Sequence, residues 1–210
     1  MGPSEEDVAR KILGALAALP VSTNRRLVAI AGPPASGKST IASLVQDRLI
    51  ADGIKAGLVP MDGFHLDNSI LAQRGLRARK GSPETFDLAG FVSLLDRLKR
   101  EGEVVIPTFD RSRDISIGSS QVIKADMMTV IVEGNYLLLD RPGWRGLAKL
   151  WDFSVFLGVQ PLELERRLLE RWRAHGLSEQ DAMSKAQGND LPNAALVTES
   201  ALPADLMISS

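Results

Sequence analysis

The chain has 210 residues, enough for one substantial hydrophobic core. Its formal net charge of −1 excludes the strongly basic footprint of a nucleic-acid-binding or membrane-surface protein. It contains no cysteine, which excludes disulfides, Cys-ligated zinc and thiol chemistry and is typical of a reducing compartment.

The first predicted element is an amphipathic helix that begins after Ser4 and ends before Pro20. Its first turn is acidic, whereas a signal peptide begins with positive charge. No apolar run in the chain approaches the ~20 residues that a membrane helix needs. We therefore expect a cytoplasmic protein without membrane insertion, folded as a single domain over residues 1–210.

Residues 32–40 fit the pattern G-x-x-x-x-G-K-[ST] of a phosphate-binding loop. A buried strand is predicted before the loop over residues 27–31, and apolar residues at helical spacing follow it. Backbone N–H groups would cradle phosphate oxygens, Lys38 would hold the β- and γ-phosphates, and the Ser39 hydroxyl would ligate Mg²⁺. The predicted nucleotide-binding residues are Gly32, Pro33, Pro34, Ala35, Ser36, Gly37, Lys38, Ser39 and Thr40.

A second strand is predicted over residues 56–61, and Asp62 follows it directly. Ligands of open α/β sheets bind outside the carboxyl ends of the strands. An aspartate at this place can accept the proton of a substrate hydroxyl that attacks a γ-phosphate. The alternative is an Asx-turn or a helix N-cap. Beside a phosphate-binding loop, we favour a catalytic base.

Residues 77–87 are predicted to form a polar, basic loop, because Gly and Pro interrupt any regular pattern. Arg79 and Lys80 are candidates for contact with an anionic substrate or with the phosphates. We expect Arg77 to be solvated. Asp87 is predicted to cap the helix that follows.

A short strand is predicted over residues 104–106, and a separate short hairpin is predicted around Gly118, within residues 115–123. The charged segment between them carries Asp110 and Arg113. Such a segment either lies at the surface or lines a substrate pocket.

The run most typical of a strand, residues 128–132, ends at Glu133. An acidic residue at the end of a strand beside the phosphate-binding loop is placed to order Mg²⁺ or its waters. Two further strands are predicted, over residues 153–157 and 206–208.

Four arginines lie within eight residues of a predicted helix, at positions 166, 167, 171 and 173. One interpretation is a solvated helix face whose arginines pair with neighbouring glutamates. The other is a lid over residues 161–188, whose arginines close over the transferring phosphate. With a phosphate-binding loop in the same chain, we favour the lid. A loop is predicted over residues 189–194.

Together these motifs resemble those of P-loop small-molecule kinases, the family of uridine kinase, phosphoribulokinase and bacterial pantothenate kinase. The resemblance rests on the phosphate-binding loop and on residues 61–65, 79–87 and 133–136, and it spans the chain from Leu27 to the C-terminus. It is closest to the bacterial branch known as fructose transport system kinases. The blocks around Asp62 and Glu133, in this order, are far more specific than the loop.

The resemblance implies a P-loop α/β fold, with a parallel sheet of about five strands, helices on both faces and an arginine-bearing lid. It implies a kinase that uses ATP and Mg²⁺ to phosphorylate a hydroxyl of a small metabolite, such as fructose, and a family in which homodimers are common. Asp62 would be the catalytic base, and Glu133 would assist Ser39 at the metal. The lid, including Arg171 and Arg173, would act with Lys38 on the phosphate.

The remaining predicted residues would contact the nucleotide or the substrate. Asn193 would lie near the adenine. The predicted substrate residues are Phe64, His65, Arg79, Lys80, Asp110, Arg113, Asn135 and Tyr136.

The sequence departs from its relatives after Phe109-Asp110, where uridine kinases carry a histidine and this chain carries Arg111. Pantothenate kinases also use a histidine in this region. Nucleoside and pantothenate kinase activities therefore stand as alternatives to a sugar kinase. An alternative of another class is a nucleotide-binding regulator associated with a transport system. A small molecule that stimulates ADP production would exclude that alternative.

Overall fold

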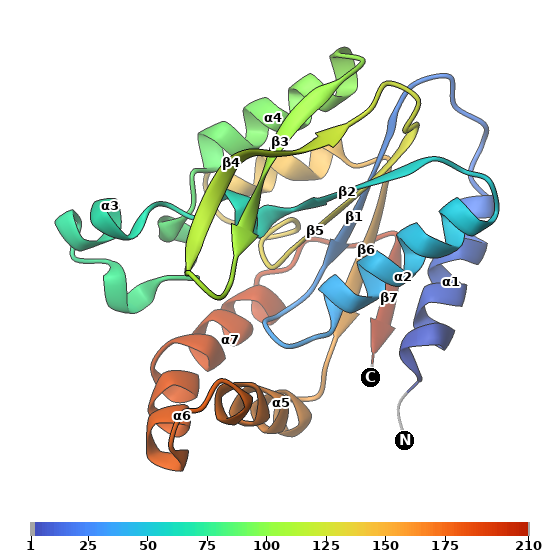
Figure 1. Ribbon diagram of the computed structural model, residues 1–210. Coiled ribbons are helices and arrows are strands. Elements are labelled where there is room, and N and C mark those ends of the chain that lie inside the picture. Colours follow the sequence, from blue (N-terminus) through green and yellow to red (C-terminus); the bar gives the residue numbers. More distant parts are fainter. Residues whose placement is uncertain (1–2, 210) are drawn as a thin grey trace.

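The computed structural model describes residues 3–209 and is organised around a five-stranded parallel sheet (Figure 1). The strands lie in the order β2-β5-β1-β6-β7. Their bounds are β1 (Arg26–Ala31), β2 (Ala56–Pro60), β5 (Thr129–Gly134), β6 (Phe153–Gly158) and β7 (Leu206–Ser209). The predicted parallel sheet of about five strands is therefore confirmed.

The register of the central strands explains how the chemistry-bearing residues meet. Ile30 of β1 and Pro60 of β2 both pair with Glu133 of β5. The chain leaves β1 for the phosphate-binding loop and leaves β2 for Asp62 immediately beyond this row. Because all carboxyl ends of a parallel sheet lie at one edge, the predicted phosphate, metal and base residues emerge side by side.

Both faces of the sheet are buried, as the side chains of β1 show, because they enter two different apolar clusters in alternation. Leu27, Ala29 and Ala31 belong to one apolar cluster, and Val28 and Ile30 belong to another. Side chains of a strand point alternately to opposite faces, so each face requires its own covering layer. This requirement explains why β1 reads as a continuous apolar run.

Helices supply those covering layers. Helices α1 (Glu5–Ala17) and α2 (Lys38–Ala51) cover one face, and their apolar residues join Val28 and Ile30. Helix α4 (Leu88–Arg100) and the 3₁₀ helix at Trp144–Leu150 cover the other. Figure 1 shows α1 and α2 side by side, with α4 at the opposite side of the sheet. The flanking of the sheet by helices on both faces is confirmed.

A two-stranded antiparallel sheet lies outside the main sheet and corrects one prediction. Strand β3 (Val104–Asp110) pairs with β4 (Ile115–Ile123), and Asp110 pairs with Ile115 at the turn. The predicted hairpin around Gly118 is wrong, because residues 115–123 form one continuous strand. The alternating residues that suggested two short strands instead pair along the whole length of β3, so the turn falls at residues 111–114.

The region between β6 and β7 is mainly helical and corrects a second prediction. Helices α5 (Pro161–Ala174) and α6 (Glu179–Lys185) are followed by a π-helical turn at Ala186–Asp190 and then by α7 (Leu191–Glu199). The predicted loop over residues 189–194 is wrong. Gly188 and Pro192 suggested a break, but proline is accepted in the first turn of a helix, where its missing N–H is not needed.

Arg25 lies directly before β1, and its side chain is buried. Its guanidinium donates to the backbone oxygens of Leu98, Glu101, Gly102, Lys124 and Met127. Arginine offers five N–H donors and no acceptor, so carbonyls around the end of α4 and in the segment before β5 together satisfy the guanidinium. Arg25 thereby ties the amino end of β1 to α4 and to the segment before β5.

Among the residues that the structure describes, no helix is both long enough and apolar enough to cross a membrane.

Candidate active site

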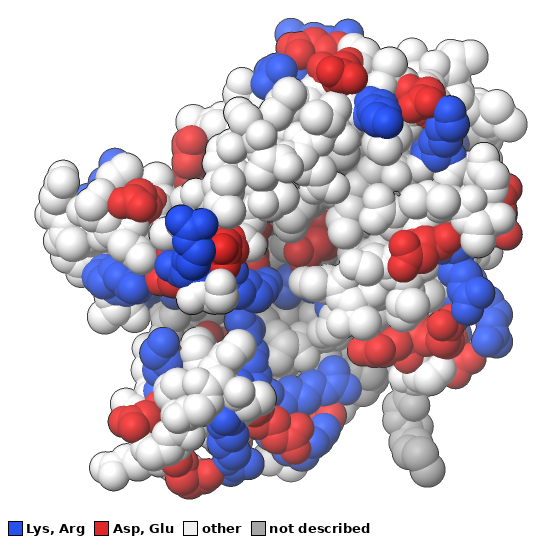
Figure 2. Space-filling view, viewed as in Figure 1, with Lys and Arg blue, Asp and Glu red and all other residues white. Residues whose placement is uncertain are grey.

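A cavity of about 1330 Å³ opens at the carboxyl edge of the sheet. Its walls come from six segments: the phosphate-binding loop, the 3₁₀ helix η1 (Met61–Phe64) with His65, residues 77–86, the β3–β4 turn, the carboxyl end of β5 and the lid helices. Figure 2 shows Lys and Arg atoms around the hollow between the lid and the rest of the molecule, with Asp and Glu atoms among them. The cavity is thus lined by charges of both signs.

The phosphate-binding loop obtains its shape from three positions. Gly37 precedes α2 with φ 83°, and Ala35 also has a positive φ of 61°. A positive φ is strained for alanine, and a strained backbone at this position is typical of a ligand-binding loop. Gly32 has another role: a Cβ there would lie 2.7 Å from the Leu157 carbonyl oxygen of β6. Glycine at position 32 therefore lets the loop pass close to the neighbouring strand.

Lys38, Ser39 and the buried Glu133 form a group at the base of the cavity. The Ser39 hydroxyl donates to Glu133 Oε2 at 3.1 Å, and Lys38 Nζ donates to the Pro33 carbonyl at 3.3 Å. Burial lowers the pKa of Lys38, against the opposing effect of the Glu133 and Asp62 charges. Burial likewise raises the pKa of Glu133, while Lys38 lowers it. Each ion is therefore short of solvation, a state that phosphates and a cation would relieve.

The same group tests whether Mg²⁺ fits. Mg²⁺ prefers hard oxygen donors and keeps several waters, so it needs only one or two protein ligands beside phosphates. Ser39 and Glu133 offer a hydroxyl and a carboxylate that already face one another. Within residues 3–209, no cluster of three or more His, Cys, Asp or Glu side chains could hold a metal by itself. The donor set therefore fits a magnesium ion that arrives with a nucleotide.

Asp62 lies in η1, directly beyond β2, and its side chain is 20% exposed. Its Oδ2 accepts a hydrogen bond of 2.6 Å from Arg111, which the β3–β4 turn delivers. Gly63 fixes this junction, because a Cβ there would lie 2.7 Å from the Pro107 carbonyl oxygen of β3. The proposed base is thus held between the sheet edge and the hairpin.

Lys80 is the most enclosed cation at the opposite wall, with only 9% of its side chain exposed. Its ammonium donates to Asn68 Oδ1 and to the Asp114 backbone oxygen, each at 2.7 Å, and it pairs with Asp114 Oδ1 at 3.0 Å. Arg77, which we expected to be solvated, also pairs with Asp114 at 3.0 Å. Two cations therefore share one carboxylate.

Tyr136 supports this wall from beneath rather than lining it. The side chain is buried, and its hydroxyl donates to the Gly81 carbonyl at 2.6 Å. Burial raises the pKa of Tyr136, so the phenol stays protonated and keeps donating. The aromatic core thereby fixes the position of the loop that carries Lys80.

His65 lies between two aromatic rings, with centroids 4.1 Å from Phe86 and 4.7 Å from Phe109. Its Nδ1 lies 2.8 Å from the Asp62 carbonyl oxygen. Burial lowers the pKa of His65, while the Asp62 charge opposes that shift. A neutral His65 donating from Nδ1 would orient the backbone of the proposed base.

The lid separates its arginines into two groups. Arg166 and Arg167 pair with Glu163, and Arg173 pairs with Glu179 at 2.5 Å. Arg171 lines the cavity, lies over the Trp172 ring at 5.5 Å, and has no ion pair within the described part of the chain. Burial lowers its pKa, and the charge of Arg111 adds to that shift. Only Arg171 of these four is therefore available to a phosphate in the cavity.

The helical region of the lid is joined to the wall that faces it through Asn189. Asn189 donates to the Lys80 carbonyl at 2.9 Å, and the buried Asn193 donates to Asn189 at 3.3 Å. The Trp172 indole donates to Asp190 at 2.6 Å. The lid and the basic loop are thus hydrogen-bonded across the cavity.

The structure brings together ten of the residues predicted from the sequence. Lining the cavity are Pro34, Lys38, Ser39, Asp62, His65, Lys80, Glu133, Asn135, Arg171 and Asn193. The Asn135 Oδ1 atom is buried without a hydrogen-bond partner within residues 3–209, so it is an available acceptor.

The other predicted site residues lie outside this cavity. Phe64 is in the core against Phe91, Arg79 pairs with Glu84, and Asp110 caps its own turn at Ser112. The remaining residues outside it are Gly32, Pro33, Ala35, Ser36, Gly37, Thr40, Arg113, Tyr136 and Arg173.

Sequence reasoning missed Arg111, Asp114, Phe109, Trp172 and Asn189. The segment around Arg111 was recognised as charged, but a turn has no periodicity that shows which charge points inward.

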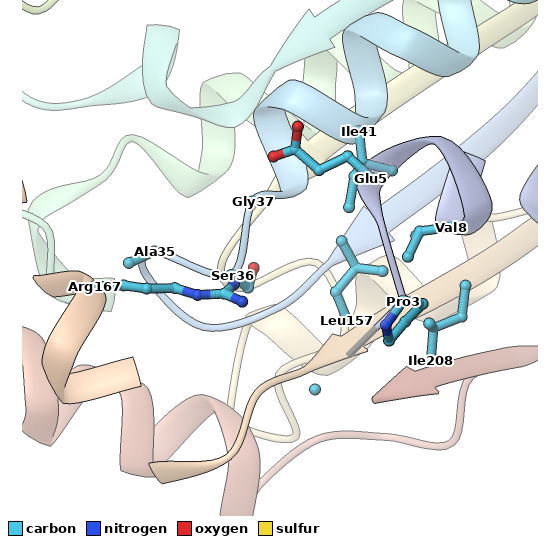
Figure 3. A pocket seen from close by; sticks show the side chains of 11 residues that line it. Pro3, Glu5, Val8, Ala35, Ser36, Gly37, Ile41, Leu157, Arg167 and Ile208 are labelled. Atoms are coloured by element: carbon cyan, nitrogen blue, oxygen red, sulfur yellow. The ribbon is translucent and has the colours of Figure 1, made fainter. Parts of the chain in front are cut away.

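A second cavity, of about 240 Å³, lies behind the phosphate-binding loop. Ala35, Ser36 and Gly37 line it, and Figure 3 shows Glu5 of α1 and Arg167 of α5 beside them. None of these residues lines the large cavity, so the phosphate-binding loop separates two hollows.

Comparison with known proteins follows this geometry. Residues 27–208 match the Phosphoribulokinase / Uridine kinase family. The chain belongs to this family. It is therefore a P-loop kinase, and its sheet and flanking helices are those of this group.

Three relatives indicate how near the likeness is. A "putative fructose transport system kinase" from Silicibacter sp. TM1040 is 46% identical, with a TM-score of 0.90 over 98% of this chain and 99% of that one. The uncharacterized protein YggC of Escherichia coli is 37% identical over 97% of this chain and 86% of its own length. A putative uridine kinase of Schizosaccharomyces pombe is 30% identical over 88% and 83%.

Proposed function

We propose that this kinase transfers the γ-phosphoryl group of ATP, with Mg²⁺, to a hydroxyl of a small metabolite. One observation carries the proposal. The group of Lys38, Ser39 and Glu133 shares one cavity with Asp62, and in this proposal Asp62 meets the acceptor while the other three serve the nucleotide and its metal. Sugars such as fructose are the first acceptors to test, because a close relative bears that name.

Each residue has a role in this proposal. Backbone N–H groups of the loop and Lys38 hold the phosphates, and Arg171 offsets the charge that develops on the transferring group. Asp62 accepts the proton of the acceptor hydroxyl. The hydroxyl oxygen then forms its bond to the γ-phosphorus while the bond from that phosphorus to the bridging oxygen of ADP breaks.

Mg²⁺, held through Ser39 and Glu133, would neutralise phosphate charge when bound. Transfer of this kind needs little covalent chemistry from the protein, so positioning and electrostatics supply the rate. The hydrogen bonds between Asn189 and the Lys80 loop support a closed lid that excludes water.

The experiment measures ADP release from ATP and Mg²⁺ against a panel of acceptors. The panel holds fructose and other sugars, uridine, cytidine, pantothenate, ribulose 5-phosphate and glycerate. We expect one acceptor class to raise ADP release far above background and to yield one phosphate ester per ADP. Tight ATP binding without stimulation by any acceptor would contradict the proposal and favour a nucleotide-binding regulator.

A further inference from the structure

The acceptor end of the cavity carries more positive than negative charge. Arg77, Lys80 and Arg111 face it with only two carboxylates, Asp62 and Asp114. Asp114 is shared by Arg77 and Lys80, and Asp62 is held by Arg111. This excess of one positive charge is a property of the described residues that line this end.

The pair of Arg111 and Asp62 has a consequence for catalysis. The 2.6 Å contact places the guanidinium on Asp62 Oδ2, one of the two carboxylate oxygens that an acceptor hydroxyl could approach. An arginine cannot give up its proton in a protein, so it cannot simply become neutral and leave. For both oxygens of Asp62 to be open to an acceptor, Arg111 must exchange this carboxylate for another anion or for water.

Arg111 and Asp62 differ in how freely their side chains can move. Arg111 lies in a four-residue turn, and 52% of its side chain is exposed, whereas Asp62 is fixed by η1 and 20% exposed. A long, half-exposed side chain can therefore swing while the aspartate stays. The other cations of this end, Arg77 and Lys80, are already engaged with Asp114 from the same turn.

We propose that Arg111 determines specificity, by holding Asp62 until an acceptor that carries an anionic group takes over the guanidinium. This inference rests on the proposed function and narrows it: the acceptor is a hydroxyl compound with a carboxylate or a phosphate. Such an anion balances the excess positive charge at this end, whereas a neutral sugar does not. Arginine binds both groups through two parallel N–H donors.

The test compares neutral acceptors with anionic compounds that have the same number of carbon atoms. Glycerol is compared with glycerate and with glycerol 3-phosphate, and fructose with gluconate and with fructose 6-phosphate. Binding is measured by thermal melting and calorimetry of the full chain, with Mg²⁺ and a saturating non-hydrolysable ATP analogue so that the phosphate-binding loop is occupied. The two anionic arms distinguish a carboxylate from a phosphate.

The decisive variant is Arg111→Gln, with Arg111→Lys as a variant that keeps the charge. The matched control is Arg145→Gln, because Arg145 is similarly exposed, pairs with Asp140 at 3.0 Å and lies outside the cavity. Loss of one charge-assisted hydrogen bond predicts at least about a 10-fold weaker binding of the anionic compound in Arg111→Gln. We expect Arg111→Lys to recover part of that loss, and Arg145→Gln to match the wild type.

Four results would overturn the inference. Neutral and anionic members of each set could bind the wild type equally, or Arg111→Gln could leave anion binding unchanged. Alternatively, that variant could weaken the ATP analogue while anion binding stands, which would assign Arg111 to the γ-phosphate. A neutral acceptor that is phosphorylated regardless of Arg111 would uphold the proposed function and remove this inference. If anion binding depends on Arg111 but no acceptor is phosphorylated, the inference about Arg111 stands and the proposed function is contradicted.

Discussion

The nucleotide side and the acceptor side of the cavity are built in different ways. On the nucleotide side, Lys38 and Ser39 begin the helix that follows β1, and the buried Glu133 lies on the adjacent strand β5. On the acceptor side, the pairs of Asp62 with Arg111 and of Lys80 with Asp114 join segments far apart in the chain. The nucleotide side is rigid, and its charged groups are short of partners. On the acceptor side, positive and negative side chains pair with one another until a ligand arrives.

The difference teaches how specificity can vary on a constant scaffold. The phosphate-binding loop is fixed by the sheet, and its glycines are required by close contacts such as that of Gly32 with β6. The acceptor side depends on one turn and one loop, which can change without disturbing the strands. Each prediction below alters one side and leaves the other in place.

The largest effect is expected from Lys38→Ala, which breaks the nucleotide side. Lys38 lines the base of the cavity beside Glu133 and is the charge expected to hold the β- and γ-phosphates. Its loss should lower kcat by about 10²–10³-fold, as for other single charge-stabilising groups, and should weaken ATP binding as well. Steady-state kinetics and calorimetry with ATP measure both. An unchanged rate and affinity would contradict this account of the loop.

The lid provides the next comparison, between two arginines of one helix. Arg171→Gln should lower kcat by about 10²-fold, because Arg171 alone of the lid arginines lines the cavity without an ion pair. Arg166→Gln is the matched control, since Arg166 is paired with Glu163 and Glu170 on the outer face. We expect less than about a 2-fold change in the control, as surface ion pairs contribute little. Equal losses in both variants would refute the assignment.

The junction of the two sides is broken by Gly63→Ala. The added Cβ would meet the Pro107 backbone at 2.7 Å and push η1 away from β3. Overpacking of this kind costs about 1–3 kcal/mol of stability, and kcat should fall as Asp62 shifts. Urea unfolding measures the first effect. Gly146→Ala, where the Cβ meets nothing within 4 Å, is the control and should change stability by less than about 0.5 kcal/mol.

The smallest effect concerns pH and the acceptor side. Because burial holds the pKa of His65 below its ordinary value, the folded protein resists protonation there. Below about pH 6.5 the unfolded chain binds this proton first, so the stability is fully present above that pH and falls as the pH decreases toward the folded pKa. Urea midpoints across this range should show a shallower slope for His65→Gln than for the wild type. Identical slopes would remove His65 as the cause.

The nucleotide side could be predicted from the sequence because its information is local. Residues 32–40 follow an apolar strand and Glu133 lies at the end of another, and parallel strands bring their carboxyl ends to one edge. The order of the strands was not needed to expect this meeting. The sheet of about five strands with helices on both faces was instead implied by the resemblance to P-loop kinases.

The acceptor side could not be predicted to the same degree, because its contacts depend on turns. The hairpin was misplaced around Gly118, so the turn that carries Arg111 and Asp114 was not recognised as a turn. The helical structure of the lid region continues through Gly188 and Pro192. Packing of Ala186 and Ala194 against α5 outweighs the unfavourable helix propensity of glycine and proline. Tertiary contacts decided both cases.

The most direct test of the whole account compares Asp62→Asn with the wild type, for ATP affinity and for acceptor-stimulated ADP release. The account places Asp62 on the acceptor side, so we expect an unchanged ATP affinity and a stimulated rate lower by about 10²–10⁴-fold, the usual contribution of a general base. The Asn variant keeps the size of the side chain and can still meet Arg111 through its oxygen. Full stimulated activity in Asp62→Asn, or a loss of ATP binding that explains the lower rate, would contradict the division of the cavity into two sides.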